Sequence, residues 1–390
     1  MSEAPLVDRL RSRLLVESRS SDIGGVDLTS LVRDESSVLA DDVALRALTR
    51  EVEASLTGLG PLDGLLAIPG VTDVLVNGAD EVWLDRGNGL ERVAAGFADD
   101  AAVRQCAQRI AARVGRRLDD ASPFVDARLP DGTRLHAVLP PISPRPCLSL
   151  RVLRRGNDSL ESLVPAQVVP LLAAVIHARM SFVISGSTGA GKTTLLAAML
   201  GCVSASERIV IVEDSAELVV AHPHVVCLQT RTPNVEGAGV VALRELVRQS
   251  LRMRPDRLVV GEFRGAEMLE LLLALNTGHD GGAATLHANS AADVPARFAA
   301  LAALCGVGSD AVAVQAAAAF DIVIHLHRRG GIRAVETVAL LDLRDAALRV
   351  RPIWSLDPVT SAVDVEAQAE FSRRLAQRGE LLNRPAVGMS

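Results

Sequence analysis

The only lysine of the chain lies in the stretch GSTGAGKTT, although the 390 residues include 41 lysines and arginines together. The stretch matches the pattern G-x-x-x-x-G-K-[ST], in which glycines allow successive backbone N–H groups to point at phosphate oxygens. A compact ammonium group fits inside such a loop, whereas a planar guanidinium is too wide for it. The spacing therefore predicts a phosphate-binding loop (P-loop) formed by Gly186, Ser187, Thr188, Gly189, Ala190, Gly191, Lys192, Thr193 and Thr194.

The residues on either side of this loop favour the same interpretation. MSFVIS, which ends at residue 185, is typical of a buried strand, and KTTLLAAML, which starts at Lys192, is typical of a helix. In such a strand–loop–helix unit the lysine reaches the β- and γ-phosphates of a nucleotide, and the next hydroxyl, here Thr193, binds Mg²⁺. The Asn-Lys-x-Asp tetrapeptide with which GTPases read guanine needs a second lysine, so we expect ATP as the nucleotide.

Three later segments carry acidic or histidine side chains at the ends of predicted strands. Ligands of open parallel sheets bind at the carboxyl ends of the strands, so we expect all three segments to reach the P-loop edge. One carboxylate after a strand is more often a helix cap or a solvated turn, but several behind a P-loop favour catalysis. The candidates are Glu213, Asp214 and Glu217 in IVIVEDSAEL, Glu262, Arg264 and Glu267 in RLVVGEFRGAE, and His279, Asp280 and His287 in TGHDGGAATLHANS.

The composition narrows the class of protein. Hydrophobic residues make up 49% of the chain but aromatic residues only 2%, so aliphatic side chains must fill the core, as in α/β proteins with apolar parallel strands. A net charge of −6 and few aromatics argue against direct binding of nucleic acid. Widely spaced cysteines without a C-x-x-C pair indicate a reducing cytosol and no structural zinc. Because no stretch reaches the roughly 18 uninterrupted apolar residues of a membrane span, we expect any membrane association to be peripheral.

The pattern of predicted strands and helices changes along the chain. Short predicted strands and one amphipathic helix are followed, beyond a basic and polar segment, by apolar strands that alternate with helices. The predicted organisation is a helical region (1–50), an α+β domain (51–150), a linker (151–160), an α/β P-loop domain (161–350) and a C-terminal tail (351–390).

Several of these segments resemble the secretion ATPase superfamily, which powers type II and type IV secretion and type IV pili. The resemblance covers about residues 60–330, and it is carried by GRRLDDASPFVDARLPDGTRLHAVLPP, RIVIVEDSAEL, LRMRPDRLVVGEFRGAEMLELLLALNTGHDG and TLHANS. Within the superfamily the chain is most similar to the CpaF/TadA-type ATPases of the tight-adherence (Flp pilus) branch. The resemblance implies a RecA-like P-loop NTPase core with a smaller α+β N-terminal domain.

The resemblance also implies roles for individual side chains. Glu213, in a segment like the family's acidic box, would help to hold Mg²⁺ and water. Glu262 would polarise the attacking water, in an atypical Walker B strand where Gly261 takes the place of an aspartate. His287, in TLHANS, resembles the histidine that senses the γ-phosphate, and His279 is a weaker candidate for that role.

Members of this superfamily work as hexameric rings whose sites lie between the two domains of a subunit and near its neighbour. The resemblance therefore makes four arginines candidates for a phosphate clamp: Arg116, Arg128, Arg134 and Arg231. Arg244, Arg248 and Arg252 repeat every four residues along one predicted helix face. Such a row could equally be a functional basic surface or a solvated helix face without a ligand.

The leading hypothesis is an Mg²⁺-dependent ATPase, peripheral at the cytoplasmic face of the inner membrane. It would form a homo-hexameric ring and power Flp pilus assembly or related export through inner-membrane platform proteins, with residues 147–160 as the hinge between its domains. One alternative is a RecA-like nucleic-acid motor of conjugal transfer. The other is a nucleotide-gated regulator that binds ATP and barely hydrolyses it.

Overall fold

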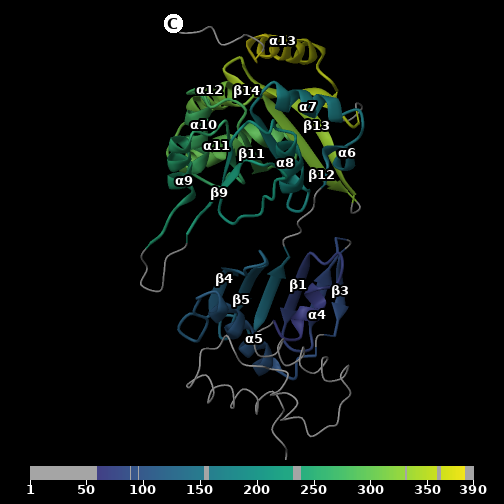
Figure 1. The fold of residues 1–390 in the computed structure, drawn as a ribbon, viewed down its shortest axis with the longest axis vertical. Helices are drawn as coiled ribbons and strands as arrows, with labels where there is room; N and C mark the ends of the chain where they lie inside the picture. Colours follow the sequence, from purple (N-terminus) through teal and green to yellow (C-terminus); the bar gives the residue numbers. More distant parts are fainter. Residues whose placement is uncertain are drawn as a thin grey trace, which may run out of the picture. The chain divides into compact units, whose positions relative to one another are not determined.

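The computed structural model describes residues 59–382, except for 88, 95, 153–157, 232–238, 330–331 and 358–361. The chain divides into two units, Met1–Arg154 and Arg155–Ser390, which we call the N-terminal unit and the motor unit (Figure 1). The predicted helical region 1–50 lies outside the described residues. Within the described ranges no helix combines the length and apolar character needed to cross a bilayer.

The described part of the N-terminal unit forms a six-stranded sheet in the order β3-β2-β1-β6-β5-β4, in which all neighbours are antiparallel. Side chains alternate between its two faces, and the apolar set packs on two helices. The elements are α4 (Leu62–Leu66), β1 (Asp73–Asn77), β2 (Val82–Asp85), β3 (Leu90–Val93), α5 (Asp100–Arg113), β4 (Phe124–Arg128), β5 (Arg134–Val138) and β6 (Cys147–Arg151).

The start of α5 and the position of β6 show how this unit is built. The Asp99 carboxylate accepts from the backbone N–H of Ala102 at 2.8 Å and so caps the helix, which buries Val103 and Ile110 against the sheet. β6 pairs with both β1 and β5, so it lies in the middle of the sheet. The predicted hinge 147–160 is therefore wrong in its first part, because residues 147–151 are held on both sides by strand hydrogen bonds.

The motor unit is built around an eight-stranded sheet in the order β14-β13-β12-β7-β11-β10-β8-β9. The strands from β12 to β9 in this order are parallel, whereas β12, β13 and β14 pair antiparallel. The strands are β7 (Phe182–Gly186), β8 (Ile209–Glu213), β9 (Val225–Gln229), β10 (Arg257–Val260), β11 (Ala283–His287), β12 (Ile322–Arg329), β13 (Ile332–Arg344) and β14 (Ala347–Ser355).

Helices cover both faces of this sheet, and each face has its own apolar core (Figure 1). One core joins Ile184 and Ile211 to α7, α8 and α13, and the other joins Val183 and Val260 to α9, α10, α11 and α12. The helices are α6 (Leu160–Leu163), α7 (Val169–His177), α8 (Lys192–Gly201), α9 (Leu243–Ser250), α10 (Glu267–Leu275), α11 (Val294–Leu304), α12 (Ser309–Ala319) and α13 (Val365–Leu382), with the 3-10 turns η2 (Leu251–Met253) and η3 (Ala291–Asp293). The predicted fold class, an α/β P-loop core with a smaller α+β domain, is confirmed.

The last part of the chain belongs to the motor unit. The sequence analysis placed the start of the tail at residue 351, but β14 continues from Ala347 to Ser355. α13 buries Ala367 and Phe371 in the motor core, and Arg378 donates to the carboxylate of Asp321 at 2.9 Å. Packing and ion pairing therefore attach the C-terminal helix to the sheet.

Candidate nucleotide-binding site

The P-loop connects the carboxyl end of β7 to the start of α8, and its shape depends on glycine. Gly189 and Gly191 have φ values of +72° and +96°, in the region that L side chains rarely adopt. Gly186 is required for a second reason, since a Cβ there would lie 2.6 Å from the backbone oxygen of Leu326 on the neighbouring strand β12. These constraints leave a loop of backbone amides directly before a helix N-terminus, which is a suitable site for an anion.

Lys192 lies at the centre of this loop, with 8% of its surface exposed. Its ammonium group donates to the backbone oxygens of Gly186 and Ser187 at 3.1 and 3.0 Å. Burial is the main cause that lowers the pKa of Lys192, and the nearby Glu262 carboxylate opposes it. The ammonium is thus held by carbonyl groups that a phosphate could replace.

His287 connects the P-loop lysine to Glu262. It ends β11 and lies opposite Gly186 in the parallel pairing with β7. Lys192 Nζ is 3.3 Å from His287 Nδ1, and because an ammonium only donates, Nδ1 accepts and the ring proton belongs on Nε2. The same ring presents Nε2 to Oε1 of Glu262. Three of the predicted site residues therefore form one chain of contacts.

Burial and the nearby charge of Lys192 favour the neutral form of His287. Burial lowers its pKa most, the positive charge of Lys192 lowers it further, and Glu262 acts in the opposite direction. Glu262 in turn accepts from Arg264 at 2.6 and 2.8 Å, both bonds ending on Oε2. A neutral imidazole between a cation and a carboxylate can respond to a ligand that changes the position of either neighbour.

Glu213 is buried at the carboxyl end of β8, with 4% of its surface exposed. Its Oε1 accepts from the backbone N–H groups of Glu217 and Leu218, both at 3.1 Å. Gly261 leaves the space that this side chain occupies, since a Cβ at Gly261 would lie 2.7 Å from Glu213 Cγ. The glycine before Glu262, an aspartate in the usual motif, is therefore required by the packing of the neighbouring acid.

The donors near the P-loop suit Mg²⁺ bound mainly through a nucleotide. Within the described ranges no cluster of three or more His, Cys, Asp or Glu side chains could hold a metal by itself. Mg²⁺ usually takes one or two protein ligands together with phosphates and water. Thr193 follows Lys192 in the first turn of α8 and carries a hydroxyl that could be one of them. Thr193 and Glu213 are oxygen donors of the right kind for this ion.

Two further candidates, Glu267 and His279, have structural contacts. Glu267 accepts from the backbone N–H groups of Arg264 and Gly265 at 2.5 and 2.6 Å, which fixes the turn after Glu262. His279 and Asp280 come before β11 and therefore lie at the opposite edge of the sheet, where His279 contacts the backbone oxygen of Ala274 at the end of α10. The expectation that their whole segment reaches the P-loop edge is wrong, and only His287 does so.

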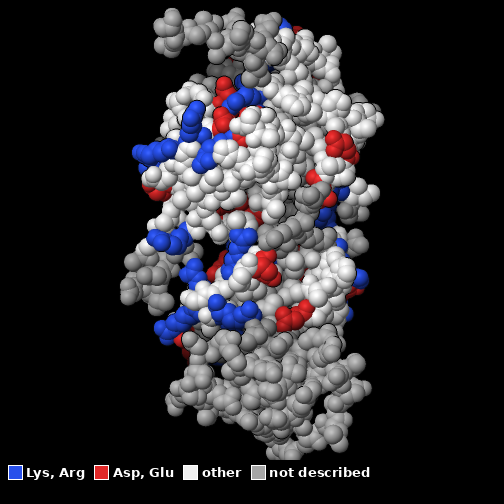
Figure 2. Space-filling model, viewed as in Figure 1, with Lys and Arg blue, Asp and Glu red and all other residues white. Residues whose placement is uncertain are grey.

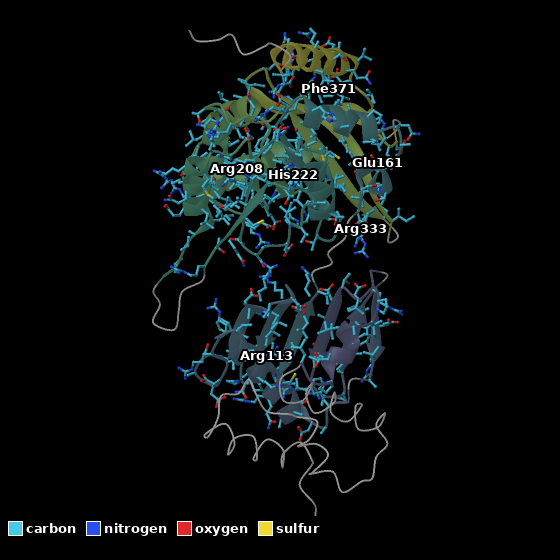
Figure 3. The ribbon with its side chains drawn as sticks, in the orientation of Figure 1. Arg113, Glu161, Arg208, His222, Arg333 and Phe371 are labelled. Carbon is cyan, nitrogen blue, oxygen red and sulfur yellow. The ribbon has the colours of Figure 1, made fainter. Side chains whose placement is uncertain are left out.

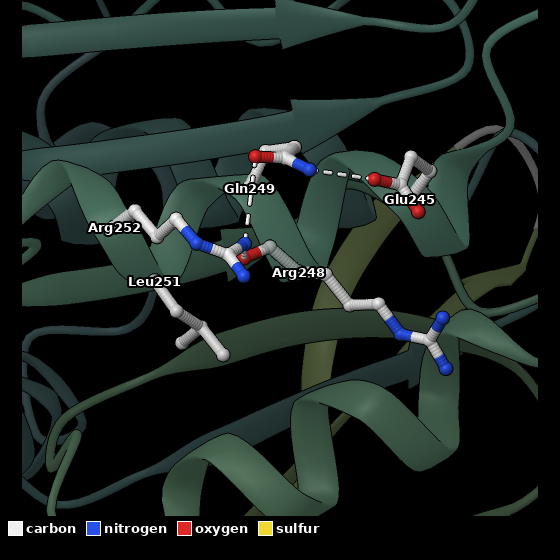
Figure 4. Close-up of a pocket in the computed structure, with 5 residues that line it drawn as sticks. All are labelled: Glu245, Arg248, Gln249, Leu251 and Arg252. Atoms are coloured by element: carbon white, nitrogen blue, oxygen red, sulfur yellow. Dashed lines mark hydrogen bonds between the residues drawn. The ribbon is translucent and has the colours of Figure 1, made fainter.

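The arginine row of the motor unit is tied to a neighbouring helix. Arg244 and Arg248 on α9 both donate to Glu270 of α10 at 2.7 Å, and Figure 2 shows basic and acidic side chains side by side on this unit. Figure 4 shows the open groove beside them, in which Gln249 links Glu245 to Arg252. Of the clamp candidates in this unit, Arg231 donates from Nε to the backbone oxygen of Gly239 at 2.6 Å.

In the N-terminal unit the structure places two clamp candidates next to each other. Arg128 on β4 lies opposite Arg134 on β5, which lies opposite Arg151 on β6. Arg134 donates to Asp126 at 2.6 and 3.1 Å, and the positive charge of Arg116 also helps to lower the pKa of that carboxylate, after the larger effect of Arg134. Alternation along the strands puts this row on the sheet face that does not pack on α5.

Sequence reasoning named Arg264 as a candidate without predicting its contact with Glu262, and it missed Arg333. Arg264 holds the carboxylate of Glu262, and Arg333 donates from Nε to the Gly189 backbone oxygen at 3.0 Å. Arg264 follows a candidate acid by two residues, so its spacing was a usable signal. Arg333 is 144 residues from its partner, and only the pairing of β12 with β7 and β13 brings it to the loop.

Comparison with known proteins matches the chain to one family. Residues 55–334 match the family described as "Type II/IV secretion system protein". The chain belongs to this family. It is therefore a P-loop ATP hydrolase of the secretion ATPase type.

Individual relatives agree with the family assignment. A putative conjugal transfer protein of Mycobacterium tuberculosis is 51% identical over 329 residues, which cover 81% of this chain and 94% of that protein. The conjugal transfer protein TrbB of Rhizobium radiobacter is 32% identical over 278 residues, or 69% of this chain and 83% of the relative. The crystal structure of the pilus retraction motor PilT with bound ADP has a TM-score of 0.51 and 20% identity, covering 83% of this chain and 88% of PilT, and supports the fold.

Proposed function

We propose that this secretion ATPase is an Mg²⁺-dependent motor that hydrolyses ATP at the edge where β7, β8, β10 and β11 end. The observation that carries the proposal is the chain of contacts from Glu262 through His287 to Lys192. It links the proposed water-activating carboxylate to the proposed phosphate-binding lysine through one neutral imidazole. A regulator that only binds nucleotide does not need a carboxylate at this position.

Each residue of this chain has a defined part in the proposed reaction. Glu262 accepts a proton from the attacking water, and Lys192 leaves the backbone oxygens of Gly186 and Ser187 to contact phosphate. That movement breaks the contact of Lys192 with His287 Nδ1 and thereby changes the environment of the ring that faces Glu262. His287 thus reports the presence of a terminal phosphate to the proposed base.

The Mg²⁺ ion would be held by the Thr193 hydroxyl and the Glu213 carboxylate. Bound there, the ion would neutralise negative charge on the phosphates. Glu213 keeps its position through the backbone N–H groups of Glu217 and Leu218 and through the space left by Gly261.

The row of Arg128, Arg134 and Arg151 supports the proposal that the N-terminal unit supplies a phosphate clamp. Asp126 is bonded to Arg134 and Asp73 to Arg151, so these carboxylates offset part of the positive charge of the row. An anion bound beside Arg128 would offset more of it. Arg128 and Arg134 are accordingly the preferred candidates, ahead of Arg116 and Arg231.

We further propose a homo-hexameric ring, peripheral at the cytoplasmic face of the inner membrane, that acts on inner-membrane platform proteins. The tight-adherence motifs favour Flp pilus assembly as its task. The second candidate is conjugal transfer, which is favoured by the names of the two relatives, both of which are described as conjugal transfer proteins. Stimulation of the ATPase by DNA, with a steep dependence on salt, would favour the second candidate over the first.

Assembly and activity test the motor proposal together. The mass of the protein in solution, measured with a non-hydrolysable ATP analogue and Mg²⁺, should be that of six subunits. The specific ATPase activity should rise with protein concentration over the range in which the ring forms. A monomer with full activity at every concentration would contradict the ring, and binding without turnover would favour the regulator.

A further inference from the structure

The hairpin of β12 and β13 extends beyond the end of β7 and reaches the outer side of the P-loop. β12 pairs with β7 up to Leu326 opposite Gly186 and then continues to Arg329. Arg333, near the start of β13, lies opposite Arg328. Figure 3 labels Arg333 at one end of the motor unit, with Phe371 of α13 at the other.

Arg333 contacts the P-loop in two ways. Its Nε donates to the backbone oxygen of Gly189 at 3.0 Å. Its stem crosses Gly191, since a Cβ built on that glycine would lie 3.3 Å from Arg333 Cδ. Within the described part of the chain Arg333 has no carboxylate partner, whereas Arg329 on the same hairpin is paired with Glu336 at 2.9 Å.

The contact acts on a peptide unit that faces both sides of the loop. The carbonyl of Gly189 and the N–H of Ala190 belong to one planar trans peptide, so they point in opposite directions. The carbonyl is held outside by Arg333, while the Ala190 N–H points to the backbone oxygen of Ser187 at 3.3 Å, on the inner side. That oxygen also accepts from Lys192, so the N–H points into the part of the loop where phosphate would bind.

We propose that Arg333 is a positioning residue of the nucleotide site, which holds the 189–190 peptide with its N–H directed at the bound phosphates. A charge-assisted bond to the carbonyl polarises the peptide and makes its N–H a better donor. It also fixes the loop before the nucleotide arrives, which lowers the entropy cost of binding. The inference rests on the proposed nucleotide function.

Because Arg333 acts on the loop and not on the γ-phosphate, ADP and ATP should depend on it equally. Arg333→Met keeps the stem that packs on Gly191 and removes the donor. In the full-length protein we expect Kd for a fluorescent ADP and for a non-hydrolysable ATP analogue to rise by the same factor. That factor should be about five- to tenfold, the range of one ordinary hydrogen bond, because the bond from Arg333 is exposed to solvent. KM for ATP should rise with it, while kcat changes less than about twofold.

Two further variants give this test its specificity. Arg333→Lys can still donate to the carbonyl and should recover most of the affinity. Arg329→Met removes the same charge from the same hairpin without touching Gly189, and should bind both nucleotides as the wild type does. The inference would be overturned if Arg333→Met bound both nucleotides with unchanged affinity, lost affinity only for the ATP analogue, or had a lower kcat at unchanged KM. It would also be overturned if Arg333→Lys recovered no affinity, or if Arg329→Met lost as much affinity as Arg333→Met.

Lys192→Ala, measured in parallel, separates this inference from the proposed function. If Lys192→Ala loses nucleotide affinity and Arg333→Met does not, the role of Arg333 is wrong while the nucleotide site stands. If Lys192→Ala binds both nucleotides as tightly as the wild type, the proposed site itself is wrong.

Discussion

The two edges of the motor's parallel sheet carry similar charged side chains that are held in different ways. At the amino edge Arg257, with 1% of its surface exposed, donates to both carboxylate oxygens of Glu207 at 2.7 and 3.2 Å and to the backbone oxygen of Ile176 at 2.8 Å. Asp321, at the same edge, accepts from the backbone N–H of Ser181 and from Arg378. Ile176 and Arg378 lie on α7 and α13, and Glu207 and Ser181 lie just before β8 and β7, so packed elements hold all of these partners in place.

At the carboxyl edge the partners can be exchanged. Lys192 donates to loop carbonyls, His287 accepts from it, and Glu262 is shared between His287 and a half-exposed Arg264. The difference shows that a buried charge alone does not mark a site. A site is marked by charges whose present partners are groups that a ligand can replace, and the following variants test that distinction.

The largest effect on the free energy of unfolding is expected at the amino edge. Arg257→Ala leaves the half-buried Glu207 carboxylate with Arg179 at 3.4 Å as its remaining ion-pair partner, and should lower the free energy of unfolding by about 3 kcal/mol, the lower end of the range for a broken buried pair. The ATPase rate of the folded fraction should stay near that of the wild type. Urea unfolding measures this in a Trp83→Phe background, where Trp354 reports the motor unit alone. In the double variant Arg257→Met, Glu207→Leu most of the stability should return, and a double variant as unstable as Arg257→Ala would contradict the comparison.

Lys192→Ala is the corresponding change at the carboxyl edge. We expect the ATPase rate to fall by about 10²–10³-fold, because one positive donor to the phosphates is lost. Stability should change less than in Arg257→Ala, since the hydrogen-bond partners left behind are neutral groups, two loop carbonyls and the His287 ring, and not a carboxylate. Steady-state phosphate release and the same urea titration check both expectations. A loss of stability as large as that of Arg257→Ala, with activity retained, would remove the difference between the edges.

Gly261→Ala tests the packing between the two acids. The new Cβ would lie 2.7 Å from Glu213 Cγ, and the resulting displacement should cost about 1–3 kcal/mol of stability and reduce the ATPase rate. Gly308→Ala is a matched control in the same unit, because nothing lies within 4 Å of a Cβ there. Equal rates in the two variants would show that the position of Glu213 does not matter for turnover.

The smallest expected effect concerns His325, a buried histidine on β12 whose Nδ1 is 2.9 Å from the Ser185 hydroxyl. Burial lowers its pKa most, and Glu336 opposes the shift. Below pH 6.5 the unfolded chain therefore binds more protons than the folded one, so stability is full above that pH and falls as the pH drops toward the folded pKa. The contribution is at most about 1.4 kcal/mol per pH unit.

His325→Gln should accordingly make stability depend less on pH below 6.5, although the variant starts from a lower value. Urea titrations at pH 7.5, 6.5 and 5.5 in the Trp83→Phe background measure this change. His136→Gln, an exposed histidine of the N-terminal unit, is the control. The same pH dependence in His325→Gln and the wild type would contradict the assignment.

The sequence was sufficient to predict those features that depend on local pattern. The strand before the P-loop, the helix after it, and the strands ending at Glu213 and His287 follow from apolar runs and glycine spacing, and each is observed. Parallel pairing then brings their ends together at one edge of the sheet. The contact between Lys192 and His287, 95 residues apart, is a consequence of that pairing.

Features that depend on pairing register or packing could not be predicted. The polar turn HDGG could equally well precede or follow a strand, and the sequence does not distinguish the two. His279 and Asp280 were therefore predicted at the wrong edge of the sheet. Residues 147–151 were predicted to be part of the hinge 147–160, because nothing in the local sequence shows that β1 and β5 lie on both sides of them. Arg333 reaches the P-loop only through a hairpin formed more than 130 residues later in the chain.

The most direct test of the central claim is single-turnover hydrolysis of ATP by Glu262→Gln, measured together with its affinity for ATP. Glutamine keeps the size of the side chain but does not accept a proton from water, so we predict ATP affinity near that of the wild type. The single-turnover rate should be about 10²–10⁴-fold lower. Glu217→Gln, another acid after a strand of the same edge, should hydrolyse ATP almost normally. Hydrolysis by Glu262→Gln at the wild-type rate would contradict the account.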